Sequence, residues 1–209
     1  MNLKKVLRIV KRNPKRLLEA ARKRITGYLP PIGKACITGL EITTLQTYAA
    51  KATQGIVEIG VLDAGTTREM ALVAHVPIYG IDPLIPDSMD EQLQGSEETI
   101  QHNMSFYKQF FFFQAYSYDV VKTWKKPFDL IFIDGDHTYD AVKKDAEDWI
   151  PLLTPGGFVA FHDAGPVYSE KSEHIGYDGP IQLIEELKKD NTLTYIETKD
   201  SLVVFKKNI

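Results

Sequence analysis

Short apolar runs alternate with stretches of helical periodicity through most of the chain. Runs at residues 56–59, 78–81, 110–113, 130–133 and 158–161 predict strands. Helical spacing of apolar positions predicts helices at 40–52, 67–74, 91–107, 120–124, 139–153 and 180–189. Apolar runs separated by helices are typical of a parallel sheet that is covered by helices on both faces. The pattern therefore predicts an α/β fold with a doubly wound, Rossmann-like, mostly parallel sheet.

The last two predicted strands follow a different connection. Residues 193–197 and 202–206 flank the short polar sequence Lys199-Asp200-Ser201. Two strand-like runs joined by so short a turn predict an antiparallel hairpin that closes the sheet. The four phenylalanines at 110–113 are interpreted as a core strand rather than as a stacking platform.

The start of the chain differs from the rest in its charge. Residues 1–25 hold ten Lys or Arg against Glu19 alone, which leaves 15 basic and 27 acidic residues in the remainder. Apolar residues at helical spacing predict two short amphipathic helices there, and GYLPPIG at 27–33 is expected to end them. We therefore expect a basic helical arm and linker over residues 1–33 and one globular domain over residues 34–209.

Charge also limits the partners that we expect. The chain of 209 residues has a net charge of −3, but its body is acidic, which argues against a nucleic-acid-binding core. Two roles stay open for the arm. Its apolar stripe packs on the body or on a second subunit of a homo-oligomer, or its basic face contacts an anionic membrane surface or an acidic partner.

Cysteine content and hydropathy predict the compartment. The single cysteine, Cys36, excludes a disulfide framework and any CxxC-type metal site. The sequence has no apolar run of about 20 residues and no secretory signal pattern at its start. We therefore expect an intracellular, cytoplasmic protein, with peripheral membrane contact through the arm left open.

The first chemical pattern follows the first predicted strand. The sequence EIGVLDAGTT at 58–67 leads into a helix, and Gly60 has no side chain to block a ligand that approaches the backbone. Asp82 ends the next strand, where a carboxylate can accept hydrogen bonds from both hydroxyls of a ribose. Together they predict an adenosine site, the alternative being an ordinary strand-to-helix turn.

The acidic residues of this turn indicate which ligand it binds. A dinucleotide site needs GxGxxG for its pyrophosphate, whereas this turn lacks that spacing and carries Glu58 and Asp63, which would repel phosphates. An NAD-dependent oxidoreductase is therefore the disfavoured alternative. S-adenosylmethionine has a sulfonium and an ammonium group and no phosphate, so it suits acidic surroundings.

A second pattern follows the fourth and fifth predicted strands. The sequences FDLIFIDGDHTY at 128–139 and LLTPGGFVAFHD at 152–163 lie downstream of VEIG and YGID. This set resembles class I S-adenosylmethionine-dependent methyltransferases, in the branch of sugar and macrolide O-methyltransferases and cephalosporin-hydroxylase-like proteins. The resemblance covers about residues 40–206 and leaves the arm outside.

The resemblance implies roles for individual residues. It assigns Glu58 and Gly60 to the methionine portion of the cofactor, Asp82 to its ribose and Ser117 to the loop beside its adenine. The cofactor-binding set that it implies is Glu58, Gly60, Asp63, Thr67, Asp82, Ser117 and Asp134. In metal-dependent members, the corresponding strand ends hold magnesium. Asp134, His162 and Asp163 are thus the implied metal ligands, and His137 and Asp134 the catalytic residues, with His137 as the base.

These residue types also suit methyl transfer on chemical grounds. An alcohol becomes a good nucleophile only when it loses its proton, which a divalent cation and a nearby imidazole promote. Oxygen ligands with one imidazole fit Mg²⁺ or Mn²⁺ better than zinc. Structural roles remain the alternatives: helix capping for Asp134 and His137, and a polar pair that closes the sheet for His162 and Asp163.

The sequence thus predicts an S-adenosylmethionine-dependent O-methyltransferase. We expect it to act, with magnesium assistance, on a hydroxyl of a sugar, a glycan precursor or a small natural product. Residues 165–179 are a candidate substrate lid. The alternative from another class is a membrane-peripheral protein that keeps the fold without catalysis. Its support is the basic arm and Ala64, which stands where the family usually has glycine.

Overall fold

A computed structural model of the protein describes residues 32–33, 36–86, 94–165 and 176–209. The predicted arm and nearly all of its linker lie outside the described residues, as does most of the candidate lid. The division into an arm over 1–33 and a domain over 34–209 therefore stays a prediction.

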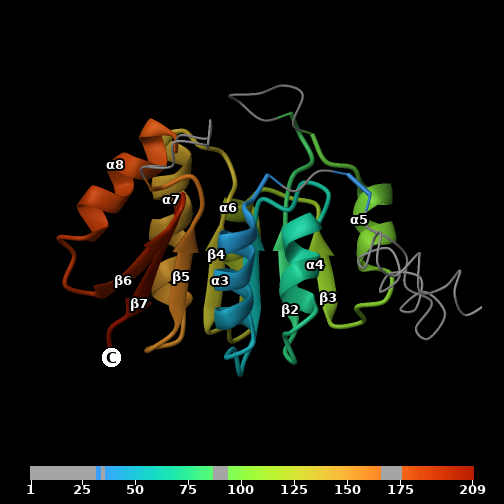
Figure 1. The fold of residues 1–209 in the computed structure, drawn as a ribbon, viewed down its shortest axis with the longest axis horizontal. Helices are drawn as coiled ribbons and strands as arrows, with labels where there is room; N and C mark the ends of the chain where they lie inside the picture. Colours follow the sequence, from blue (N-terminus) through green and yellow to red (C-terminus); the bar gives the residue numbers. More distant parts are fainter. Residues whose placement is uncertain (1–31, 34–35, 87–93, 166–175) are drawn as a thin grey trace, which may run out of the picture.

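The described residues form a seven-stranded sheet with the strand order β3-β2-β1-β4-β5-β7-β6 (Figure 1). Its strands are β1 (Ile56–Ile59), β2 (Ile78–Ile81), β3 (Phe110–Phe113), β4 (Leu130–Ile133), β5 (Phe158–Phe161), β6 (Leu193–Lys199) and β7 (Leu202–Lys207). Strands β1 to β5 pair in parallel, whereas β7 is antiparallel to both β5 and β6. The predicted sheet and its closing hairpin are confirmed.

Helices cover both faces of this sheet, each over its own apolar cluster. One face packs against α3 (Gly39–Ala49), α4 (Gly65–Ala71) and α5 (Glu97–Met104). The other packs against α6 (Ser117–Val120), η1 (Val121–Thr123), α7 (Tyr139–Trp149), η2 (Ile150–Leu152) and α8 (Asp178–Leu187). Figure 1 shows α3 and α4 in front of the strands and α7 behind them. All four residues of β1, β2 and β4 are buried, as expected for strands covered on both sides.

Helix boundaries depart from the sequence prediction where local capping decides them. The helix predicted at 91–107 begins at Glu97, because the Ser96 side chain accepts a hydrogen bond from the Thr99 N–H. Its predicted residues 91–93 lie outside the described part of the chain. The predicted 67–74 helix begins two residues earlier, at Gly65. The phenylalanine run forms β3 as predicted, but it lies at the sheet edge and Phe111 is exposed.

The order of the strands positions a crevice. From β1 the chain proceeds outward to β2 and β3, then returns to the other side of β1 to form β4 and β5. Loops therefore leave the carboxyl ends of β1 and β4 in opposite directions, where sheets of this type bind their ligands, and the region between these two strand ends is called the crevice below. Gly60 lies in this crevice with φ +86°, and a Cβ on it would lie 1.9 Å from the Asp134 carbonyl oxygen. Only glycine permits this approach of the two strand ends.

Gly60→Ala tests this constraint. We expect it to lower the free energy of unfolding by about 3 kcal/mol or more, because it combines a left-handed backbone with an overlap against Asp134. Chemical denaturation measures the change. Gly39→Ala is the matched control, since nothing lies within 4 Å of its added methyl at the start of α3, and it should be neutral or slightly stabilising. Equal effects of the two substitutions would contradict this account.

Candidate active site

Asp82, at the end of β2, holds the loop that follows β1. Its Oδ2 accepts hydrogen bonds from the N–H groups of Val61, at 2.8 Å, and Leu62, at 2.9 Å. Its Oδ1 accepts one from the Leu84 N–H, at 2.7 Å. A carboxylate offers about four lone-pair sites, so these three bonds leave about one for a ligand. The sequence predicted a bond to each ribose hydroxyl, whereas this arrangement leaves room for one.

Ala64 occupies the position where the resemblance leads us to expect glycine. Its backbone is left-handed, with φ 58° and ψ 29°, and its side chain is fully buried at the start of α4. A left-handed alanine costs roughly 1–2 kcal/mol, which the packing around it offsets. The residue before it is held by Asn103 on α5, whose side chain donates to the Asp63 carbonyl oxygen at 2.7 Å.

Two polar side chains are buried beneath this loop without good hydrogen bonds. Among the described residues, Glu58 Oε2 and Thr67 Oγ1 are buried and have no hydrogen-bond partner. Burial raises the pKa of Glu58 well above its usual range, the nearby Thr67 hydroxyl lowers it in part, and the charges of Asp134 and Asp82 raise it further. Buried polar atoms without partners are costly, so this place suits a ligand that carries a donor or a positive charge.

Ser117 at the start of α6 bonds to a carboxylate that the sequence did not assign. Its hydroxyl donates to Asp145 Oδ1 on α7. Burial raises the pKa of Asp145 to about 6, although the bond from Ser117 opposes the shift. The side chain of Ser117 is therefore fixed by α7.

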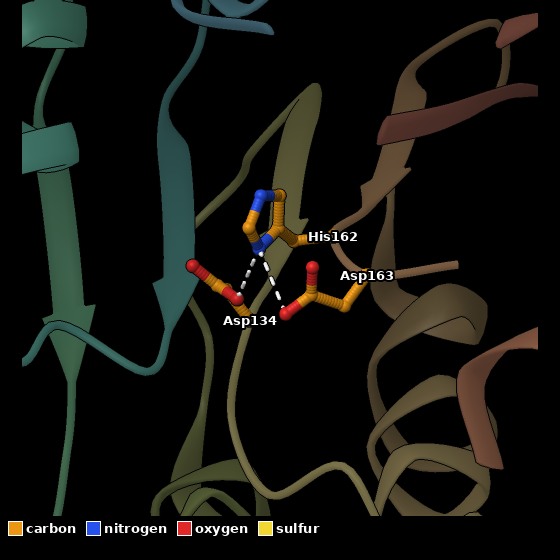
Figure 2. Close-up of side chains that lie close together, drawn as sticks. All are labelled: Asp134, His162 and Asp163. Atoms are coloured by element: carbon orange, nitrogen blue, oxygen red, sulfur yellow. Dashed lines mark hydrogen bonds and ion pairs between the residues drawn. The ribbon is translucent and has the colours of Figure 1, made fainter. Parts of the chain in front are cut away.

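The carboxyl ends of β4 and β5 bring together Asp134, His162 and Asp163 (Figure 2). His162 Nδ1 lies 2.9 Å from Asp134 Oδ1 and 3.4 Å from Asp163 Oδ2. One potential ligand atom from each residue lies within 4.8 Å of the others. Figure 2 shows both carboxylates directed at the same ring nitrogen. Two carboxylate oxygens and one imidazole form a donor set that fits Mg²⁺ or Mn²⁺.

His137 lies beside this cluster. Its Nε2 is 3.2 Å from Asp163 Oδ2 and 3.8 Å from Asp134 Oδ1, and its ring lies 4.3 Å from that of Tyr177. Burial lowers the pKa of His137, but the hydrogen bonds and charges of Asp134 and Asp163 raise it more, to about 10. In this state His137 is a proton donor at neutral pH. It can serve as a base only when another cation neutralises the two carboxylates.

His162 is the more buried of the two histidines. Burial lowers its pKa, but Asp134, Asp163 and Glu41 together raise it well above the usual range. Glu41 comes from α3, and its Oε2 lies 3.4 Å from His162 Nε2. Burial raises the pKa of Glu41, yet its bonds with His162, Ser201 and Thr38 lower it to about 2. His162 thus lies between carboxylates on both sides of its ring.

The structure brings together most of the residues that the sequence singled out. One group lies at the loop after β1 and consists of Glu58, Gly60, Thr67 and Asp82. The other group lies at the ends of β4 and β5 and consists of Asp134, His137, His162 and Asp163. Asp63 also lies in the loop after β1, and its carboxylate packs against Gly33.

Three residues of the site were missed from the sequence, whereas Tyr177 was expected as part of the candidate lid. Asn103 and Ser201 had no sequence signal, because each acts through contacts between distant elements. Glu41 had one: Thr38 and Glu41 have the spacing of a capping box, which the structure contains. That signal predicts the start of a helix but gives no hint of His162, which lies 121 residues later.

Comparison with known proteins identifies the protein family of this chain. Residues 47–164 match the family Methyltransf_24, described as a methyltransferase domain. An uncharacterised protein of Acanthamoeba polyphaga mimivirus is 30% identical over 113 residues, which are 51% of this chain and 50% of that protein. The match thus spans half the length of this relative.

Solved structures share the fold. An O-methyltransferase from Bacillus cereus, in complex with SAH, aligns with a TM-score of 0.61 and 15% identity over 92% of this chain and 97% of that one. The O-methyltransferase TomG from Streptomyces achromogenes, in complex with SAM, aligns with a TM-score of 0.61 and 17% identity over 93% and 90%. At these identities the likeness concerns the fold, and it confirms the predicted Rossmann-like sheet.

The Asp145 environment predicts a dependence of stability on pH. Because folding raises its pKa from 3.8 to about 6, neutral Asp145 stabilises the fold below about pH 4, and this contribution is lost as pH rises through 6. Asp145→Asn does not titrate. Relative to that variant, the free energy of unfolding of the wild type should fall by roughly 2 kcal/mol between pH 4 and 7.

Urea denaturation across this pH range measures the difference. Ser117→Ala serves as a comparison, because losing the bond that favours charged Asp145 should widen the pH effect. A stability difference between wild type and Asp145→Asn that is the same at every pH would contradict the assignment.

Proposed function

This chain belongs to the family of methyltransferase domains, and on that premise we propose that it methylates a hydroxyl oxygen. The donor is S-adenosylmethionine, and the acceptor is a sugar, a glycan precursor or a small natural product. Mg²⁺ or Mn²⁺ assists the transfer. The observation that carries this proposal is the cluster of Asp134, His162 and Asp163 beside the buried, unpartnered polar atoms of Glu58 and Thr67.

The donor side of the crevice has the polarity that a sulfonium ligand needs. Glu58 is buried, and an ammonium group beside it would provide the missing hydrogen bond and favour its carboxylate form. Asp82 keeps about one free lone-pair site, which suits one ribose hydroxyl. Ser117, fixed by Asp145, is assigned to the adenine end. A pyrophosphate would instead meet carboxylates, so these residues favour methyl transfer over hydride transfer from NAD.

The acceptor side is assigned to the other cluster. Asp134, His162 and Asp163 are the residues that would hold the divalent cation. When bound, such a cation supplies a Lewis acid that lowers the pKa of the acceptor hydroxyl. With Asp134 and Asp163 neutralised, His137 loses the attraction that raises its pKa and can accept the hydroxyl proton at Nε2. Tyr177 packs on the His137 ring and limits its rotation.

The proposal leaves the role of the arm open. In the described part of the chain, no helix is long and apolar enough to cross a membrane. Peripheral membrane contact through residues 1–25 rests on their basic charge and stays a prediction.

Titration calorimetry with S-adenosylmethionine tests the donor. We expect the wild type to bind it and not NAD, and Asp82→Ala to weaken binding at least about tenfold, because hydrogen bonds to a charged group and the loop that Asp82 holds are both lost. Asp129→Ala is the matched control. Asp129 also accepts several backbone N–H bonds, but at the amino end of the sheet, so its loss should leave the affinity unchanged. Equal affinities of wild type and Asp82→Ala would refute the ribose assignment.

Turnover with a panel of sugars and glycosides tests the metal. EDTA should abolish methyl transfer and Mg²⁺ should restore it, because the proposed proton transfer needs the cation. Asp134→Asn should lose most activity and recover none of it with added Mg²⁺. Full activity in EDTA would remove the metal from the proposal. If the protein binds S-adenosylmethionine but methylates no hydroxyl acceptor, the alternative of a membrane-peripheral protein that keeps the fold without catalysis is favoured.

A further inference from the structure

A buried carboxylate on α3 contacts the cluster of Asp134, His162 and Asp163 at the Nε2 side of the His162 ring. Glu41 is 1% exposed. Its Oε2 lies 3.4 Å from His162 Nε2, on the side of the ring opposite Asp134 and Asp163. Its Oε1 accepts hydrogen bonds from the Ser201 N–H, at 2.8 Å, and from the Ser201 hydroxyl, at 2.6 Å. Both oxygens of Glu41 are therefore engaged with residues far away in the sequence.

Ser201 extends the contact to a second candidate ligand. Its hydroxyl lies 3.2 Å from Asp163 Oδ1, and its carbonyl oxygen accepts the N–H groups of Ala164 and Gly165. The turn between β6 and β7 is thus bonded both to Glu41 and to the end of β5. Glu41 thus contacts one candidate ligand, His162, directly, and it shares the single hydroxyl proton of Ser201 with a second, Asp163.

The contact with His162 bears on metal binding. An imidazole that binds a cation through Nδ1 must carry its remaining proton on Nε2. An ionised carboxylate can only accept a hydrogen bond, so Glu41 beside Nε2 favours that form. In the metal-bound form the Nδ1 lone pair would then face the space beside Asp134 and Asp163, whose oxygens lie 2.9 and 3.4 Å from Nδ1.

We propose that Glu41 is a positioning residue that fixes the orientation and protonated nitrogen of His162 and thereby sets the divalent-cation affinity of the site. This inference rests on the proposed function, because it takes His162 as a ligand. Glu41 does not touch the substrates. It acts through His162 directly and through Ser201 on Asp163.

A local role in helix capping does not account for these contacts. Glu41 forms a capping box with Thr38, whose N–H donates to Oε2 at 2.7 Å. A capping glutamate needs only that bond and can remain in water. Full burial of a carboxylate is costly unless every lone pair finds a donor, and here the donors come from His162 and Ser201.

Glu41→Gln separates the two roles. The Gln side chain oxygen can keep the Ser201 N–H bond, which turns its NH₂ group toward His162 Nε2. That group donates to Nε2 and moves the imidazole proton to Nδ1, where it blocks a metal bond. Thr38→Ala is the matched control. It removes the hydroxyl that accepts the Glu41 N–H and donates to Asp200, but it removes no atom that bonds the Glu41 carboxylate.

Electron paramagnetic resonance of Mn²⁺ measures the effect on the full chain. We expect Glu41→Gln to raise the Mn²⁺ dissociation constant by about 10–100-fold and to remove the ¹⁴N coupling of a directly bound imidazole. Thr38→Ala should keep both the affinity and the coupling. S-adenosylmethionine affinity, measured by calorimetry, should stay within about twofold in both variants.

Other outcomes overturn the inference. A Glu41→Gln protein that binds Mn²⁺ like the wild type, or a Thr38→Ala protein that loses as much affinity, would refute the positioning role. If Glu41→Gln fails to fold, Ser201→Ala decides: the lost hydroxyl should weaken Mn²⁺ binding by about 2–10-fold, and an unchanged affinity would refute the role. A wild type that binds S-adenosylmethionine but no Mn²⁺ would refute the metal part of the proposed function and this inference with it.

Discussion

The contact between the ends of β1 and β4 is the constraint on which the crevice depends. Both strands are central and buried, and the chain leaves them in opposite directions. The loop after β1 must then pass against the backbone of Asp134, which only Gly60 allows. The pairing of β1 with β4 fixes the distance between Glu58 and Asp134 along the two strand ends, and the contact at Gly60 fixes the path that the loop takes beside them.

Electrostatic balance is the second property of the crevice. Carboxylates outnumber histidines there. Asp134 and Asp163 raise the pKa of His137, and the same two residues together with Glu41 raise the pKa of His162. The acidic cluster therefore favours protons on both imidazoles. A bound cation would also be attracted to this cluster, so the proposed metal and the protons of the two histidines compete for the same carboxylates.

Sequence patterns predicted the strands more accurately than the site. Runs such as 130–133 are apolar and end in polar residues, so burial alone marks where β4 begins and ends. Helix α4 was misplaced by two residues because its start depends on a left-handed Ala64, a conformation that apolar periodicity does not encode. The residues at strand ends could be found from motifs, because position along a strand is local information. Glu41 and Ser201 could not, because their contacts join residues 160 apart.

The turn at Ser201 has an evolutionary consequence. Turns of hairpins at a sheet edge are usually where a fold accepts additional residues, since little else depends on their length. Here the N–H and hydroxyl of Ser201 meet Glu41, and its carbonyl oxygen meets the end of β5. An insertion in this turn would shift all of these bonds, so we infer that relatives with the same acidic cluster keep the turn at one length while other surface loops vary.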